Sequence, residues 1–453
     1  GRAAREESGL QVTAKRDLHS SQLHLPHNAS PATYGFAMPV KWKSSTRFKP
    51  EVVLGRIRAA RTKNPQGKGS SFSGWDFYQS IPTLHSMLEF PKAAEGLDRS
   101  QLVWKAVAED PHDLSKDSFI KELNRQLSLA LSRREVSFHV LTSISMSNEV
   151  RLGTLTVEKV QLNHCGPTFP RKFQKARVEA IASSRVPATE SPPDHTRVVA
   201  TVQAKDASVA HAEAMRALDI ERALWCAFSN SQFEIFGKSW IPINVIRSGA
   251  VHTAHSSTGA VASEAVWFEP YHQPSAAFKP KNSALLKRKV QGILARLKNS
   301  NYPRDIVDAM LLYVRALDEW NQNTAFSRLW SSVERLASPG QGDYDAVVRR
   351  CAFLWDEPDY MRQTLEHLRE YRNGYVHTGT EMPEAKTYCY QLQQQFLALL
   401  WFHVGNSKFF ASLEEANRFL DLPIDLEDRK KRKAHLSKAD RFRSPRASRV
   451  SPP

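Results

Sequence analysis

Cysteine is scarce in this sequence. Four cysteines, at positions 165, 226, 351 and 389, are spread through 453 residues without a close pair. Four scattered cysteines provide neither the dense cysteine pattern of a disulfide framework nor the close pair of a zinc knuckle, so neither is expected. A protein without disulfides suits a reducing compartment, and we expect a cytoplasmic protein.

Long hydrophobic runs are also missing. The longest, residues 395–404, has ten residues and includes His403, whereas a membrane span needs about 20. This run predicts a core helix, and we expect no membrane association. Residues 1–7 lack the apolar stretch of a secretory signal, so export is not expected.

Metal and cofactor motifs are incomplete. His252 and His255 lie three residues apart, but no acid or cysteine is near in the sequence, and the Ser/Thr/Gly-rich surroundings predict a loop. The histidines within 163–165 and 194–195 are also predicted in loops, without a serine nucleophile elbow. We therefore expect no metal, no cofactor and no hydrolase triad.

The net charge of +16 is unevenly distributed. Residues 429–453 hold ten Lys/Arg and one acid, among Ser and Pro. This composition predicts a disordered basic tail over 426–453 that either contacts nucleic acid or keeps the protein soluble. The predicted nucleic-acid-binding residues are Arg429, Lys430, Lys431, Arg432 and Lys433.

The fold class predicted from the patterning is α+β. Residues 1–30 are polar and unpatterned, so we expect a flexible lead. Residues 31–275 predict a mixed α+β region, with strands over 138–146, 155–160 and 198–203 and helices over 119–131 and 208–228. Early aromatic and basic residues could follow a single nucleic-acid strand, although packing is the favoured interpretation. They are Lys63, Lys68, Trp75, Phe77 and Tyr78.

Residues 281–421 predict an all-helical domain, because apolar positions recur with helical spacing almost without interruption. An apolar stripe within 326–336 predicts a core-facing helix. The predicted helices span 283–297, 303–320, 324–337, 344–354, 359–377, 383–405 and 413–420.

An Arg-Asn-x-x-x-His segment lies near the end of this helical region. Arg followed five positions later by His occurs four times, where about one match is expected by chance, so spacing alone says little. Only Arg372 is followed directly by an asparagine. Asn373 and His377 share a helix face, whereas Arg372 points about 140° away from His377 unless Gly374 loosens the helix or a second copy contributes.

The same residues also suit a plain helix end. Basic side chains complement the helix dipole, and Gly379 is a common terminator. Residues 326–337 and 371–377 together nevertheless resemble the HEPN (higher eukaryotes and prokaryotes nucleotide-binding) superfamily, in particular its ApeA-like branch. The resemblance covers about a third of the chain.

This resemblance implies an all-α bundle that forms a homodimer and, in many members, a metal-independent endoribonuclease of prokaryotic anti-phage defence or toxin systems. It assigns catalysis to Arg372, Asn373 and His377, with support from Glu334 and Tyr375. The substrate would be RNA, since its 2′-hydroxyl is an internal nucleophile. The N-terminal region would then respond to a phage or regulatory trigger. The alternative is a non-catalytic RNA-binding or dimerisation scaffold.

Overall fold

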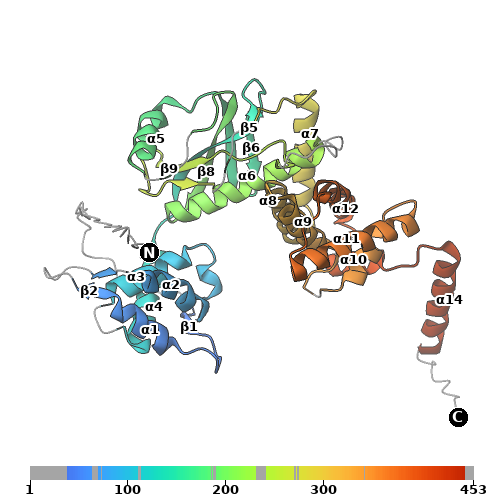
Figure 1. The fold of residues 1–453 in the computed structure, drawn as a ribbon, viewed down its shortest axis with the longest axis horizontal. Helices are drawn as coiled ribbons and strands as arrows, with labels where there is room; N and C mark the ends of the chain where they lie inside the picture. The colour runs from blue at the N-terminus through green and yellow to red at the C-terminus, as the bar shows by residue number, and fades with distance from the viewer. Residues whose placement is uncertain are drawn as a thin grey trace, which may run out of the picture. The chain divides into compact units, whose positions relative to one another are not determined.

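The computed structural model describes residues 38–63, 70–72, 74–110, 114–184, 186, 190–230, 241–269, 272, 275–340 and 342–443. The lead predicted over 1–30 and the last ten residues lie outside this part. The described chain is a mixed α+β protein with antiparallel sheets and a helical C-terminal region (Figure 1), which confirms the coarse fold class. Identification of this region as a HEPN bundle stays a prediction.

The first segment, residues 40–132, has a hydrophobic core of its own, formed by residues such as Leu54, Leu84, Val103 and Phe119. Helix α1 packs against α2, and α3 packs against α4. The region predicted over 31–275 therefore contains residues of two separate hydrophobic cores. The elements are β1 (Lys41–Trp42), α1 (Pro50–Ala59), β2 (Arg61–Lys63), β3 (Ser70–Phe72), α2 (Trp75–Ser86), β4 (Leu88–Glu89), a 3-10 turn η1 (Lys92–Ala94), α3 (Arg99–Glu109) and α4 (Lys116–Ser132).

The central element is an antiparallel sheet with the order β10-β9-β5-β8-β7-β6. Alternation along its strands divides the side chains between two faces. Val140 and Val198 face α6, whereas Leu141 and Val199 pack with Phe173 of α5. The elements are β5 (Val136–Ser147), β6 (Thr154–Val157), β7 (Val160–Gly166), α5 (Arg171–Ser183), β8 (His195–Ala204), α6 (Ala207–Ser229), β9 (Val251–Ser256) and β10 (Trp267–Phe268).

Two predicted strands match β5 and β8, whereas the third is two strands. The run predicted over 155–160 turns back at Glu158, whose φ of 52° lies in the left-handed region, so β6 ends and β7 begins there. Helix α6 begins as predicted after a turn, because the Asp206 carboxylate accepts a hydrogen bond from the Val209 amide at 2.8 Å.

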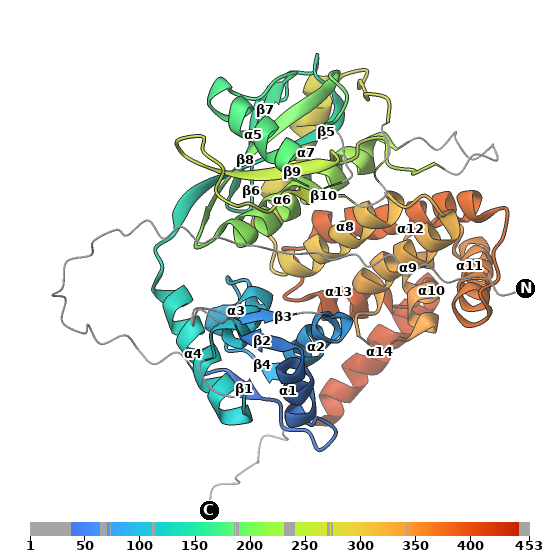
Figure 2. The ribbon, with the colours of Figure 1, turned by 60° about the vertical axis from the view of Figure 1, so that its left-hand side comes forward.

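The helical region shares one continuous hydrophobic core with the sheet and α6, so the core does not divide at residue 280. The stripe of Phe326, Leu329, Trp330, Val333 and Leu336 is fully buried, as predicted. Figure 2 shows α8, α9 and α12 grouped below the sheet. The helices are α7 (Ser283–Lys298), α8 (Pro303–Leu317), α9 (Gln322–Ala337), α10 (Tyr344–Ala352), α11 (Pro358–Thr378), α12 (Ala385–Asn406) and α13 (Leu413–Leu420).

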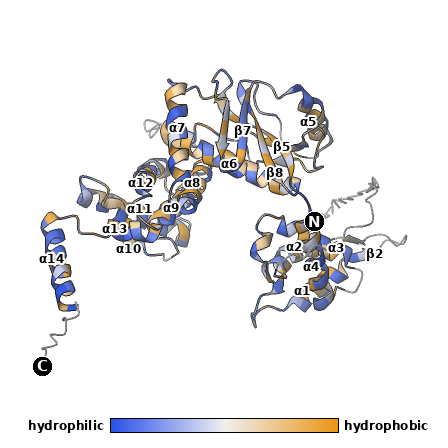
Figure 3. Cartoon of the chain, turned by 180° about the vertical axis from the view of Figure 1, so that it is seen from behind, coloured by the Kyte–Doolittle hydropathy of each residue, from blue (hydrophilic) through white to orange (hydrophobic). Residues whose placement is uncertain are grey.

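The disordered tail predicted over 426–453 needs correction, because residues Leu426–Arg443 form helix α14. None of its residues is buried, and Figure 3 shows it as predominantly hydrophilic. Acids in the first turn and arginines in the last turn complement the helix dipole. Intrahelical pairs of Lys430 with Glu427 and of Lys431 with Asp428 add to this stabilisation.

Candidate functional site

The Arg-Asn-x-x-x-His segment forms the C-terminal end of α11. The helix continues through Gly374 to Thr378, so loosening at that glycine, one of the ways in which Arg372 and His377 could converge, is not observed. Beyond the backbone of its own helix turn, a Cβ on Gly374 would meet no atom within 4 Å, which leaves the surface beside it open. Gly379 ends the helix in the left-handed conformation, with φ of 67°, and its amide donates to the Tyr375 carbonyl at 3.0 Å.

Arg372 is half-buried against an aromatic ring. Its guanidinium carbon lies 4.8 Å from the ring centroid of Tyr344, at the first position of α10. One turn earlier, Arg369 pairs with Asp345 at 2.6 Å and with Glu366 at 3.3 Å. Among the described residues no carboxylate forms an ion pair with Arg372, so its charge remains available to an anion.

His377 is exposed near the end of the helix. The amide oxygen of Asn373, which was predicted to orient this imidazole or to contact a phosphate, accepts a long hydrogen bond of 3.4 Å from Arg372. The structure thus links Asn373 to the arginine within the segment. Within the described part of the chain, no hydrogen bond joins Asn373 to His377.

Two tyrosines fix the end of α11 against the start of α9. The Tyr375 hydroxyl bonds the Thr324 hydroxyl at 3.0 Å, and the Tyr371 hydroxyl donates to the Asn323 side-chain oxygen. The same oxygen accepts from the Met382 amide at 3.0 Å. Burial raises the pKa of Tyr371 above its ordinary value near 10, so this hydroxyl remains a hydrogen-bond donor into the alkaline range. These hydrogen bonds hold the C-terminal end of α11 against the start of α9.

Glu334, predicted to support the site, has a partner on its own helix. Its carboxylate accepts from the Trp330 indole at 2.8 Å, and Trp330 packs against Tyr344 with ring centroids 6.3 Å apart. Glu334 is thus connected to Arg372 through two aromatic rings. A direct bond between its carboxylate and Arg372 or His377 is not found among the described residues.

The five basic residues predicted to bind nucleic acid all lie exposed on α14. Arg429 donates to the carbonyls of Pro423 and Ile424, at 2.9 and 2.6 Å, so its guanidinium partly caps the preceding turn. The pairs made by Lys430 and Lys431 are surface pairs that exchange readily with solvent. Phosphate groups can therefore compete for these lysines.

The histidines predicted in loops lie instead in strands. His252 and His255 are buried in β9, and the Nε2 atom of His252 lies 3.7 Å from the Glu269 carboxylate. Burial lowers the pKa of His252. His164 of β7 is buried against Glu221 at 3.1 Å, and His195 begins β8. The strands were not predicted here because their Ser, Thr and His residues interrupt the apolar alternation typical of a strand. Glu269 and Glu221, which lie beside His252 and His164, are distant from them in the sequence.

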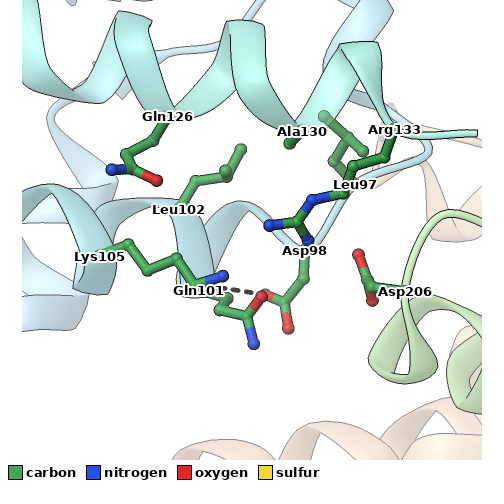
Figure 4. Close-up of a pocket in the computed structure, with 9 residues that line it drawn as sticks. All are labelled: Leu97, Asp98, Gln101, Leu102, Lys105, Gln126, Ala130, Arg133 and Asp206. Atoms are coloured by element: carbon green, nitrogen blue, oxygen red, sulfur yellow. Dashed lines mark hydrogen bonds between the residues drawn. The ribbon is translucent and has the colours of Figure 1, made fainter. Parts of the chain in front are cut away.

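A small pocket lies beside α3 and α4 (Figure 4). Its volume of about 10 Å³ is close to the minimum for one water molecule, so it is too small for an organic ligand. Its lining residues are Leu97, Asp98, Gln101, Leu102, Lys105, Gln126, Ala130, Arg133 and Asp206.

Metal clusters and membrane spans were sought in the described part of the chain. It contains no group of three or more His, Cys, Asp or Glu side chains arranged to hold a metal ion. None of its helices combines the length and apolar character needed to cross a bilayer.

Comparison of the chain with protein-family models, with curated proteins and with solved structures gives no match. The resemblance to HEPN proteins thus depends on the residues of this sequence alone.

Proposed function

We propose that this protein is a metal-independent endoribonuclease of HEPN type whose reaction centre is the C-terminal end of α11. The proposal includes a homodimer formed through the helical region and a role in prokaryotic anti-phage defence or as a toxin. The setting and the dimer come from the family resemblance.

The observation that carries the proposal is the exposure of His377 on the helix that also bears Arg372. Arg372 is half-buried, stacks on Tyr344 and has no carboxylate partner among the described residues. A guanidinium without a carboxylate in a partly dehydrated position suits a phosphate oxygen. His377 lies about 140° further round this regular helix, so its exposed imidazole and an Arg372 guanidinium meet at one RNA phosphate when the second copy of the proposed homodimer contributes one of the two groups.

Each residue has a distinct role in the proposed reaction. His377 removes the proton from the ribose 2′-hydroxyl or gives one to the leaving 5′-oxygen, as general base or acid. The 2′-oxygen attacks the adjacent phosphorus and the 5′-oxygen departs, leaving a 2′,3′-cyclic phosphate. Arg372 stabilises the negative charge on the phosphate during this step. The hydrogen bonds of Tyr375 and Tyr371 to α9 hold in place the helix that bears Arg372 and His377.

A non-catalytic RNA-binding scaffold is the second candidate function. The exposed basic helix α14 favours it, because phosphate contacts require positive charge but no reacting group. Substitution of His377 distinguishes the two candidates. An enzyme would lose cleavage and keep RNA binding and its oligomeric state, whereas a scaffold would show no cleavage to lose.

The chain offers a matched control for this substitution. Arg362 and His367 have the same spacing on the same helix, and His367 is also exposed, but no asparagine follows Arg362. We expect His377→Ala and Arg372→Ala to reduce cleavage of a mixed RNA pool at least 100-fold. His367→Ala should cleave like the unaltered protein. Equal activity of His377→Ala and His367→Ala would exclude this site.

A further inference from the structure

The net positive charge of the chain comes from two segments. One is the tail, residues 429–453, with its ten basic residues and one acid. The other is residues 41–72, which hold nine Lys/Arg and one glutamate. The remaining 396 residues are nearly neutral, with 44 basic and 45 acidic side chains. Segment 41–72 is therefore a local concentration of charge within a folded part of the protein.

The described basic side chains of this segment are largely exposed. They lie on β1, on the following turn and on α1, and they are Lys41, Lys43, Arg47, Lys49, Arg56 and Arg58. The one acid, Glu51, already has a partner in Lys116 at 3.5 Å. Within the part that the structure describes, no carboxylate pairs with Lys41, Lys43, Arg47 or Lys49. These four side chains therefore present to solvent a positive charge that no described carboxylate balances.

Helix α2, which packs against α1, begins with two exposed aromatic residues. Trp75 is 73% exposed and Tyr78 is 60% exposed, and their spacing of three places them on one helix face. Phe77 between them is buried and stacks on Phe72 of β3 at 4.4 Å, which holds the start of α2 against β3, the antiparallel partner of β2. The prediction that these aromatic side chains pack in the interior is thus confirmed for Phe77 and wrong for Trp75 and Tyr78. Lys68 lies outside the described residues.

We infer that β1, α1 and the start of α2 form a binding surface for single-stranded nucleic acid. The exposed basic side chains contact phosphates, and Trp75 and Tyr78 stack on unpaired bases. This pairing of basic and aromatic groups is independent of base identity, because every base has a flat face. A membrane surface is disfavoured, since an interfacial helix needs a continuous apolar face and exposed α1 positions include Glu51, Arg56 and Arg58.

This surface is distinct from the proposed reaction centre and needs no cleavage to operate. Its test uses the full chain and a fluorescein-labelled 15-mer of deoxythymidine, which lacks the 2′-hydroxyl. An abasic 15-mer with the same phosphates is the reference ligand. Fluorescence anisotropy gives both affinities, and their ratio isolates base stacking from the phosphate binding that α14 also provides.

We expect the unaltered protein to bind deoxythymidine at least about tenfold more tightly than the abasic strand. The double variant Trp75→Ala/Tyr78→Ala should bind both strands equally, whereas Trp75→Phe/Tyr78→Phe should retain most of the preference. Trp104→Ala is the matched control, because Trp104 is 44% exposed on α3 of the same segment. Replacing Lys41, Lys43 and Lys49 by Gln should lower the salt slope by about 0.7 for each phosphate that is no longer neutralised.

Three results would overturn the inference. The first is an unaltered protein that does not distinguish the two strands. The second is a Trp75→Ala/Tyr78→Ala variant that binds deoxythymidine normally while keeping its thermal unfolding temperature. The third is loss of binding to phosphatidylserine vesicles in that variant with unchanged oligonucleotide affinity, which would assign the surface to a membrane. The proposed nuclease is judged separately, because the 15-mer lacks the 2′-hydroxyl and its binding requires no cleavage.

Discussion

Arg372 differs from nearby arginines in what balances its charge. Arg369, on the same helix, lies 5.8 Å from the Tyr344 ring centroid and is neutralised by two carboxylates, whereas Arg372 lies closer to that ring, at 4.8 Å, and has no carboxylate partner among the described residues. An aromatic face attracts a cation but leaves its N–H groups available to other acceptors. Tyr344 therefore holds the Arg372 guanidinium in place and leaves the N–H groups of that arginine available to a phosphate.

Substitution of Tyr344 tests this positioning. Tyr344→Leu should slow RNA cleavage about 3- to 30-fold, since a partly buried cation–π contact contributes about 0.5–2 kcal/mol. Tyr344→Phe keeps the ring and should cleave at close to the normal rate. Single-turnover kinetics, with thermal unfolding as a check on folding, supply the measurement. Normal cleavage by Tyr344→Leu would show that the ring does not position Arg372.

His403 makes stability sensitive to acid. It is fully buried in α12 beside the Tyr302 hydroxyl, at 3.2 Å, and burial lowers its pKa to about 3 from an ordinary value near 6.5. The unfolded chain therefore takes up a proton that the folded chain resists. The stability associated with neutral His403 is complete above pH 6.5 and declines as the pH falls toward 3.

The variant His403→Leu isolates this effect. Between pH 6.5 and 4, the free energy of unfolding of the unaltered protein should fall relative to the variant by up to about 1.4 kcal/mol per pH unit. Urea unfolding of both proteins at pH 7, 5.5 and 4.5 measures the difference. Parallel pH profiles would mean that His403 is protonated equally easily in the folded and unfolded states.

At the level of elements, the sequence predicted helices more reliably than strands. The boundaries of α7, α9, α11 and α13 agree with the predicted ranges to within about two residues, because buried apolar residues recur with helical spacing. Strand β9 was missed, since Thr253 and His255 are polar residues buried through specific partners. A partner such as Glu269 is close only after folding.

The candidate site shows the same limit. Its location at a helix end could be predicted from Arg372, Asn373, His377 and Gly379. The contact of Arg372 with the Tyr344 ring and the hydrogen bonds from Tyr371 and Tyr375 to α9 depend on tertiary packing. No local sequence pattern predicts them. The exposure of Trp75 and Tyr78 was not predicted either, because aromatic residues are usually buried.

Helix α14 should contribute to RNA binding through charge alone. Deletion of residues 429–453 should weaken binding and reduce the dependence of log affinity on log salt, since each neutralised phosphate of a single strand contributes a slope of about 0.7. A variant that keeps the length but replaces Lys430, Lys431, Arg432 and Lys433 by Gln is the matched control for chain length. Both should lose slope, as measured by anisotropy at several salt concentrations. An unaltered slope would leave the tail a role in solubility only.

At the scale of the whole molecule, a buried ionic cluster joins the sheet-covering helix to the helical region. Arg222 of α6 is fully buried and pairs with Asp219 at 2.7 Å and with Asp318, at the end of α8, at 2.8 Å. Although burial opposes its charge, the two carboxylates raise the pKa of Arg222. The site helix α11 is bonded to α9, which begins shortly after Asp318. The cluster thus supports the site indirectly.

Removing one partner of this cluster should be costly. Asp318→Asn leaves Arg222 incompletely paired in the interior and should lower the free energy of unfolding by about 3–5 kcal/mol. The exposed pair of Arg418 and Glu414, at 3.1 Å, provides the control, and Glu414→Gln should cost less than about 1 kcal/mol. Urea unfolding measures both. A similar small loss in the two variants would show that Asp318 contributes no more than a surface carboxylate.

The most direct test of the proposed nuclease is chemical analysis of RNA ends after incubation with the pure protein in excess EDTA. The account predicts 2′,3′-cyclic phosphate and 5′-hydroxyl ends from the unaltered protein, none from His377→Ala, and no cutting of a 2′-deoxy strand. Intact RNA, 3′-hydroxyl ends with 5′-phosphates, or equal cutting by His377→Ala would contradict it.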